Sequence, residues 1–108
     1  MDPVAPRSLP VMFSCKGCAD YGNMACEVAG VLQARGLVEA AWLGAPAEEA
    51  RHAARARSRA PLYAIDGCAK RCALQWLSGH GARAKRHIIL AAPGDTAEQI
   101  AERIASGW

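Results

Sequence analysis

Two close pairs of cysteines are the residues of this sequence best suited to chemistry. Cys15 and Cys18 are separated by two residues, and Cys68 and Cys72 by three. The first spacing can chelate one tetrahedral ion from a loop, and the second, at a helix start, places both sulfurs on one helix face. Together they make the Cys₄ set typical of structural zinc. The same thiolates also suit copper(I) or an iron–sulfur cluster, and spacing alone does not choose among these cofactors.

The surroundings of the two pairs favour the thiolate form. Helix N-termini carry a positive partial charge, and Lys16, Lys70 and Arg71 add full positive charges nearby. These charges offset the excess negative charge of four thiolates on one divalent ion. The alternative interpretation is that the cysteines are small buried hydrophobic residues. Two close pairs at matching strand ends favour a metal site over that alternative.

Two aspartates are the candidate neighbours of this site. Asp66 precedes Cys68 and is expected to accept hydrogen bonds from backbone N–H groups at the next helix start, a capping role compatible with orienting a ligand loop. Asp20 is expected to cap the first helix in the same way. The fifth cysteine, Cys26, lies within that helix, and a packing role is favoured over that of a fifth ligand.

The three histidines are expected at the surface. None of them has a metal-ligand spacing to the cysteine pairs; they are His52, His80 and His87.

Short apolar runs and helical patterns alternate along the chain and must position these residues. Strands are expected at 11–14, 37–43, 61–65 and 87–91, and helices at 20–35, 46–57 and 68–77, followed by a last helix whose start is marked by Asp95 and Glu98. Strand–helix repeated four times predicts an α/β fold, a small three-layer sandwich with a four-stranded parallel sheet covered on both faces.

The order of the strands decides where the cysteines meet. Right-handed crossovers favour the order 2-1-3-4, which makes the first and third strands neighbours. Their carboxyl ends, with Cys15 and Cys68, then flank the switch point where open α/β sheets bind ligands. The predicted fold therefore brings both cysteine pairs to one edge of the sheet.

Length and composition set the class of protein. A chain of 108 residues suits a flexible arm at 1–10, which holds three prolines, and one α/β metal-binding domain at 11–108. A net charge of +3 with 21% charged residues does not demand a nucleic-acid partner. No apolar run approaches the roughly 20 residues that span a bilayer, and no secretory segment opens the chain. We therefore expect a cytoplasmic protein that binds neither membrane nor nucleic acid, whose close cysteines hold metal or do redox chemistry rather than form disulfides.

The sequence Ile65-Asp66-Gly67-Cys68, with Cys72 following, resembles the DGC family, which is named for its Asp-Gly-Cys triplet. The stretch from Phe13 to Gly22 is similar to the family's first cysteine-containing loop, and the resemblance extends from about Val11 to Ala92. Zinc binding is proposed for the family from its cysteine pattern, and no reaction or substrate comes with the name. The resemblance implies a site at Cys15, Cys68 and Cys72.

This chain departs from the family at the end of the second expected strand. Family members often carry a cysteine in a Cys-Leu-Ala-Gly type stretch, where this chain reads Trp42-Leu43-Gly44-Ala45. Either Cys18 supplies the fourth ligand, or three thiolates leave an open position of the kind that chemistry or metal hand-over needs.

Three functions fit these observations. The first is a small zinc-binding protein for metal carriage, sensing or structure. The second is a thiol redox enzyme using Cys15 and Cys18; phosphatase chemistry is disfavoured because Tyr21 stands where an oxyanion-clamping arginine is needed. The third is an interaction module whose arginine-rich second helix meets an acidic partner. Whether the protein is an enzyme stays open, with binding favoured over catalysis.

Overall fold

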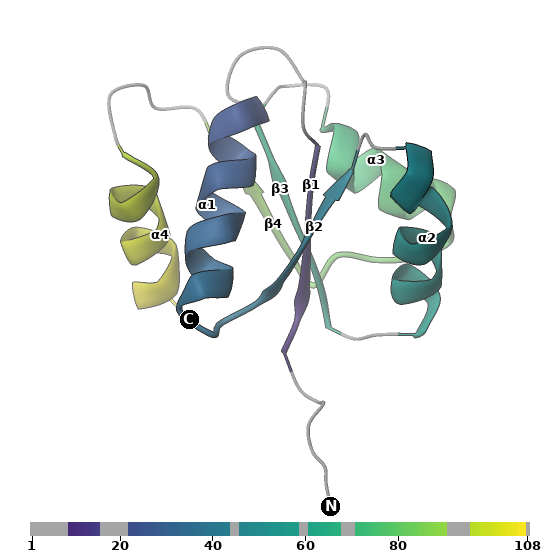
Figure 1. The fold of residues 1–108 in the computed structure, drawn as a ribbon, viewed down its shortest axis with the longest axis horizontal. Helices are drawn as coiled ribbons and strands as arrows, with labels where there is room; N and C mark the ends of the chain where they lie inside the picture. Colours follow the sequence, from purple (N-terminus) through teal and green to yellow (C-terminus); the bar gives the residue numbers. More distant parts are fainter. Residues whose placement is uncertain are drawn as a thin grey trace, which may run out of the picture.

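The computed structural model describes residues 9–15, 22–43, 46–58, 61–67, 71–90 and 96–107. Strands and helices alternate along these segments (Figure 1). The strands are β1 (Val11–Cys15), β2 (Glu39–Leu43), β3 (Leu62–Asp66) and β4 (Arg86–Ile89). The helices are α1 (Gly22–Ala34), α2 (Glu49–Ser58), α3 (Cys72–Gly79) and α4 (Ala97–Ser106), with a single 3₁₀ turn, Pro46–Glu48, leading into α2. Most of the expected arm, 1–8, lies outside the described residues.

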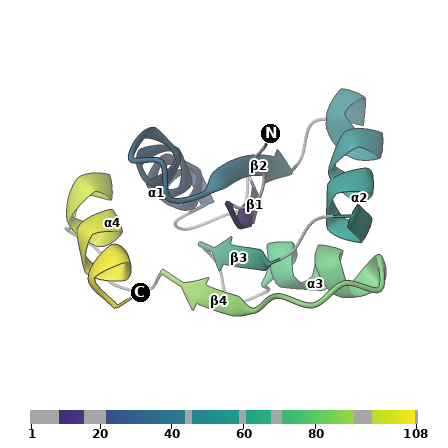
Figure 2. The ribbon, with the colours of Figure 1, turned by 90° about the horizontal axis from the view of Figure 1, so that it is seen from below.

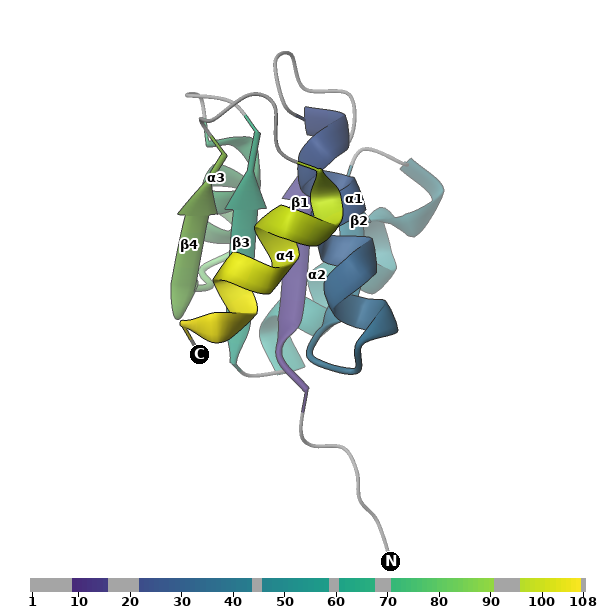
Figure 3. The same cartoon turned by 90° about the vertical axis from the view of Figure 1, so that its left-hand side faces the viewer.

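The four strands form one parallel sheet in the order β2-β1-β3-β4, which confirms the predicted fold and strand order. Helices α1 and α4 cover one face and α2 and α3 cover the other (Figure 2). Figure 3 looks onto the first of these faces, where α1 and α4 lie side by side in front of the strands. Within the described segments, no helix combines the length and the apolar character needed to cross a bilayer.

Alternation along the strands divides the core into two clusters. Met12, Tyr63 and Ile65 pack under α1 and α4. Val11 and Phe13 point to the opposite face, under α2 and α3. Because successive side chains of a strand point to opposite faces, these residues also fix the direction of the polar side chains at the strand ends.

Helix α3 begins at Cys72, so the expectation of a helix from Cys68 was wrong about its start. Arg71, the residue before the helix, has φ 56° and ψ 50°, in the left-handed region. A right-handed helix cannot continue backward through a residue in this conformation. Helix α3 therefore includes Cys72, whereas Cys68 lies outside the described residues.

The end of α1 and the start of α4 are each set by residues next to the helix. Gly36 follows α1 with φ 75°, and its N–H donates to Gln33 O, so it ends the helix. Helix α4, in contrast, is capped by Thr96 and Gln99, whose side chains each accept a hydrogen bond from the other's backbone N–H. The expected cap pair of Asp95 and Glu98 was displaced by one residue.

Candidate functional site

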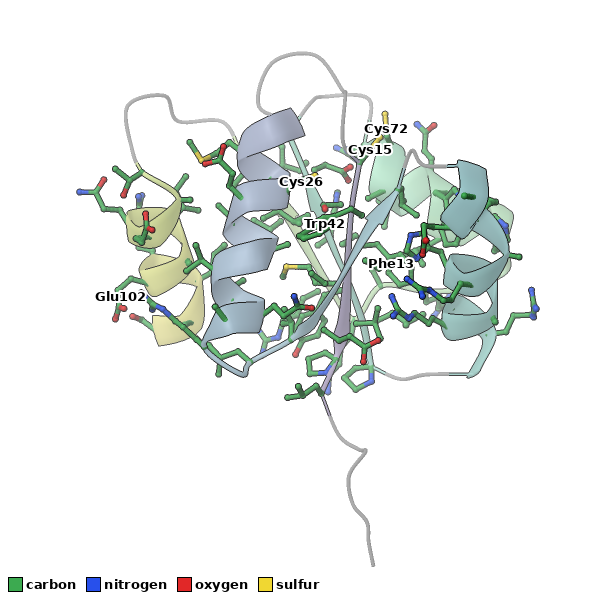
Figure 4. The ribbon with its side chains drawn as sticks, in the orientation of Figure 1. Phe13, Cys15, Cys26, Trp42, Cys72 and Glu102 are labelled. Atoms are coloured by element: carbon green, nitrogen blue, oxygen red, sulfur yellow. The ribbon has the colours of Figure 1, made fainter. Side chains whose placement is uncertain are left out.

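Cys15 and Cys72 lie on the same face and at the same edge of the sheet. Cys15 is the last residue of β1 and shares the face of Val11 and Phe13, which pack in one cluster with Ala73 of α3. Cys72 is the first residue of α3, on that face, and both thiols are partly exposed. Figure 4 shows both of them at the end of the sheet where the strands terminate. Two of the four predicted ligands therefore come to one place.

The other two predicted ligands, Cys18 and Cys68, lie outside the described residues, as does Asp20. Among the residues that the structure describes, no group of three or more His, Cys, Asp or Glu side chains is arranged to hold a metal ion. The four-thiolate site therefore stays a prediction, of which the structure places two members.

Asp66 caps α3 from the end of β3. Its side chain is buried, at 1% exposure, and points to the α3 face of the sheet. Oδ1 accepts a hydrogen bond from Ala73 N at 2.7 Å, and Oδ2 accepts a longer one from Leu74 N at 3.4 Å. These amides occupy the second and third positions of α3, where a capping side chain normally acts. The predicted capping role is correct, although the capped helix starts later than expected.

His87 is the functional candidate that the sequence reading missed. It was expected at the surface, but its side chain is only 20% exposed, and its Nε2 lies 2.7 Å from Oδ2 of Asp66. Because a carboxylate only accepts, Nε2 donates this bond. His87 is opposite Ala64 in the β3–β4 register, so it shares a face with Asp66 and reaches it diagonally. A histidine directly before the apolar run Ile88–Leu90 was the available signal for a buried partner.

Cys26 lies on the opposite face of the sheet from Cys15 and Cys72. The buried hydroxyl of Ser14 donates to Cys26 Sγ at 3.3 Å, and Ser14 points toward α1, away from the face of Cys15. Trp42 also lies on this side, because its indole N–H donates to the carbonyl of Cys26 at 3.3 Å. This contact favours the predicted packing role for Cys26. Trp42 is therefore directed away from Cys15 and Cys72.

The remaining two histidines belong to an aromatic group beneath α2 and α3. His52, expected at the surface, is 3% exposed, and its Nε2 donates to the carbonyl of Trp42 at 3.0 Å. Phe13 packs edge-on against His52 and stacks on Trp76, with ring centroids 5.3 Å apart in the second pair. His80 is half-buried over Trp76, at 4.0 Å between centroids. Both histidines therefore pack against aromatic rings of this group, and the prediction of a surface position was wrong for His52.

Comparison with known proteins agrees with this arrangement. The family model described as the DGC domain matches residues 11–105. The chain belongs to the DGC family. Anaerobic and virulence modulator AnvM of Pseudomonas aeruginosa is 30% identical to this DGC-domain protein over 104 residues, which cover 89% of this chain and 79% of that relative. No solved structure matches the chain. The matched range includes every predicted ligand, from Cys15 to Cys72.

Proposed function

We propose that this DGC-domain protein binds a thiophilic metal ion, with zinc the first choice, at the carboxyl ends of β1 and β3. Cys15, Cys18, Cys68 and Cys72 are the proposed ligands. The observation that carries the proposal is the placement of Cys15 and Cys72 on one face and at one edge of the sheet. In the sequence, Cys18 comes three residues after the end of β1, and Cys68 comes two residues after the end of β3.

The described residues fit thiolate ligands well. Cys72 occupies the first turn of α3, where the positive end of the helix stabilises a negative sulfur. Arg71 adds a full positive charge beside it. Asp66 is not a proposed ligand, because both of its oxygens are already engaged by α3 and His87. It acts instead as a positioning residue that holds the start of α3.

Among carriage, sensing and structure, we favour sensing. The relative AnvM is called an anaerobic and virulence modulator. A sensor needs a site whose chemical state can change. Thiolates at an exposed edge meet that need, because they exchange metal and react with oxidants. The reducing cytoplasm, the location expected from the sequence, would keep these thiols available.

Elemental analysis of protein purified under reducing conditions without chelator tests the proposal. We expect about one equivalent of zinc in the wild type and a loss of most of it in Cys15→Ala and Cys72→Ala, because a tetrahedral site rarely tolerates loss of a ligand. Cys26→Ala is the matched control, since it removes a thiol from α1 on the opposite face of the sheet. It should retain the wild-type metal content.

Two results would contradict the metal site. One is less than about a tenth of an equivalent of any thiophilic metal in the wild type. The other is equal metal loss in Cys26→Ala and Cys72→Ala, which would mean that the face assigned to the ligands is wrong.

The same purified protein also distinguishes metal binding from the alternative function, dithiol redox chemistry at Cys15 and Cys18. Metal-free wild-type protein whose Cys15 reacts faster than free cysteine, and whose oxidised form contains a Cys15–Cys18 disulfide, would favour the enzyme. If neither thiol reacts faster than free cysteine, the redox function is excluded.

A further inference from the structure

A groove runs along α3 on the side away from the aromatic group, and none of the functions above uses it. It is open to solvent, and its volume is about 520 Å³. Arg71, Leu74, Gln75 and Ser78 form one wall, and the segment 82–84 forms the other. Leu74, Gln75 and Ser78 lie at the spacing that places residues on one face of a helix, and Arg71 directly precedes that helix. Leu74 is half-buried and lies in this wall.

Backbone hydrogen bonds fix the two walls relative to each other. After α3 the chain reverses at Gly81, which has φ 72°, and Ala82 N donates to Leu77 O at 2.9 Å. Farther on, Lys85 N donates to Leu62 O at 2.6 Å, which ties the far wall to the sheet. Ala82 and Ala84 are packed against the core cluster beneath α3. The groove is therefore part of the folded structure and does not need a ligand to form.

The charges of the groove are of one sign. Arg71 and Arg83 line it, and an adjoining hollow of about 610 Å³ shares Arg83 and adds Lys85. No carboxylate lines either hollow among the described residues. Within those same segments, neither Arg71, Arg83 nor Lys85 takes part in an ion pair.

Other arginines of the chain do have acidic partners. Arg35 pairs with Glu102 at 2.7 Å, and Arg55 pairs with Glu39 at 3.1 Å. Among the described residues, the two guanidinium groups of the groove have no acidic partner. The amide of Gln75 and the hydroxyl of Ser78, which can donate hydrogen bonds, also line it.

We propose that the α3 groove binds a small organic anion, a phosphate or carboxylate on a short apolar body. The arginines and the two polar side chains would hold the anionic group, and Leu74 with the alanines of the far wall would contact the apolar body. The volume lies within the usual range of ligand sites, about 300–1,000 Å³.

Phenyl phosphate is a suitable probe, with inorganic phosphate and phenol as its separate halves. In a titration followed by backbone amide NMR signals, phenyl phosphate should shift Gln75, Ser78 and Arg83 in a saturable way. Inorganic phosphate should bind the same residues more weakly, because it lacks the apolar contact, and phenol should not bind. Saturation of these signals by phenol alone would overturn the proposal, as would no saturable shift with phenyl phosphate.

Variants identify the residues that recognise the anion. Arg83→Gln should weaken phenyl phosphate binding by at least about tenfold, the loss of one charge-assisted hydrogen bond. Arg71→Gly should also weaken it without loss of the fold, because glycine adopts φ 56° at no steric cost. Arg57→Gln, which removes an exposed arginine of α2, is the matched control and should bind like the wild type. Equal binding by Arg83→Gln and the wild type would overturn the proposal.

A phosphate could also ligate a metal held by Cys72, so the titration is repeated with Cys72→Ala. Unchanged binding with the same shifted amides supports the groove, whatever the metal content of the protein. Loss of binding in Cys72→Ala while Arg83→Gln binds normally would assign the anion to the metal site and overturn the groove.

Discussion

His87 Nε2 lies 2.7 Å from Oδ2 of Asp66, and this contact joins the edge strand β4 to the start of α3. The carboxylate is 1% exposed and also accepts the N–H of Ala73. Burying a carboxylate costs free energy unless its oxygens accept hydrogen bonds. The burial of Asp66 therefore depends on the bonds from both His87 and the backbone amides of α3. Cys72 begins the helix that this carboxylate caps. The contact therefore connects β4, through Asp66, to the helix whose first residue is the proposed ligand Cys72.

Replacement of Asp66 should destabilise the fold strongly. Asp66→Ala removes the cap of α3 and leaves the N–H groups of Ala73 and Leu74 without their acceptor. We expect the free energy of unfolding to fall by about 3 kcal/mol, measured by urea denaturation. Glu98→Ala, in the exposed first turn of α4, is the control and should cost less than about 1 kcal/mol. A loss below about 1 kcal/mol for Asp66→Ala would show that its contacts do not hold α3.

The contact between Asp66 and His87 should appear as a coupling energy. We expect a double-mutant cycle of Asp66→Asn and His87→Gln to give about 1–3 kcal/mol of interaction, because the two side chains bond directly. Urea denaturation of the four proteins provides the measurement. His80→Gln is the control partner, since His80 Nδ1 bonds to Trp76 O instead. Additive effects of the first pair would contradict a hydrogen bond between them.

Removal of the metal should lower the thermal stability only of proteins that retain the ligand cysteines. A ligand that binds only the folded state and is present at about 100 times its dissociation constant adds about 2.7 kcal/mol. We expect a chelator to lower the melting temperature of the wild type and of Cys26→Ala. It should have no effect on the double variant Cys15→Ala/Cys72→Ala. An equal decrease in all three would mean that the chelator acts elsewhere.

Helix α4 should depend on its cap more than on its surface ion pair. Thr96→Ala removes a side chain that accepts from Gln99 N at 3.1 Å, and it should cost about 1 kcal/mol. Arg35→Ala breaks the pair with Glu102, whose side chains are 38% and 68% exposed, and should cost about 0–1 kcal/mol because solvent screens the pair. Thermal unfolding ranks the two. A larger loss for Arg35→Ala would reverse this account of how α4 is held.

Much of the fold could be predicted from the periodicity of the sequence. The errors of that prediction lie at the starts of the helices. The parallel sheet and its order were predicted because four alternations of strand and helix leave few right-handed arrangements. The predicted start of α3 was wrong because no residue near Arg71 in the sequence indicates that it adopts φ 56°. A cap six residues upstream, Asp66, makes a later start possible by bonding Ala73 N and Leu74 N.

The proposed site was predicted in part. The position of Cys15 after an apolar run placed it at the sheet edge, and the structure puts Cys72 on the same face. The pairing of His87 with Asp66 could not be read from the chain, because it depends on the register of β4 against β3. A shift of one residue would turn His87 to the other face of the sheet.

By itself, the sequence determined the fold class, the strand order and the spacing of the thiols, because these follow from local periodicity and from the short links between elements. Only the tertiary structure decided which thiols share a face. It places Cys15 and Cys72 on the α3 side and Cys26, with Ser14, on the α1 side. It also decided that Asp66 is held by His87 and caps a late-starting α3. The reason is that strand alternation, register and helix start are coupled through packing, and no short stretch of chain carries that information.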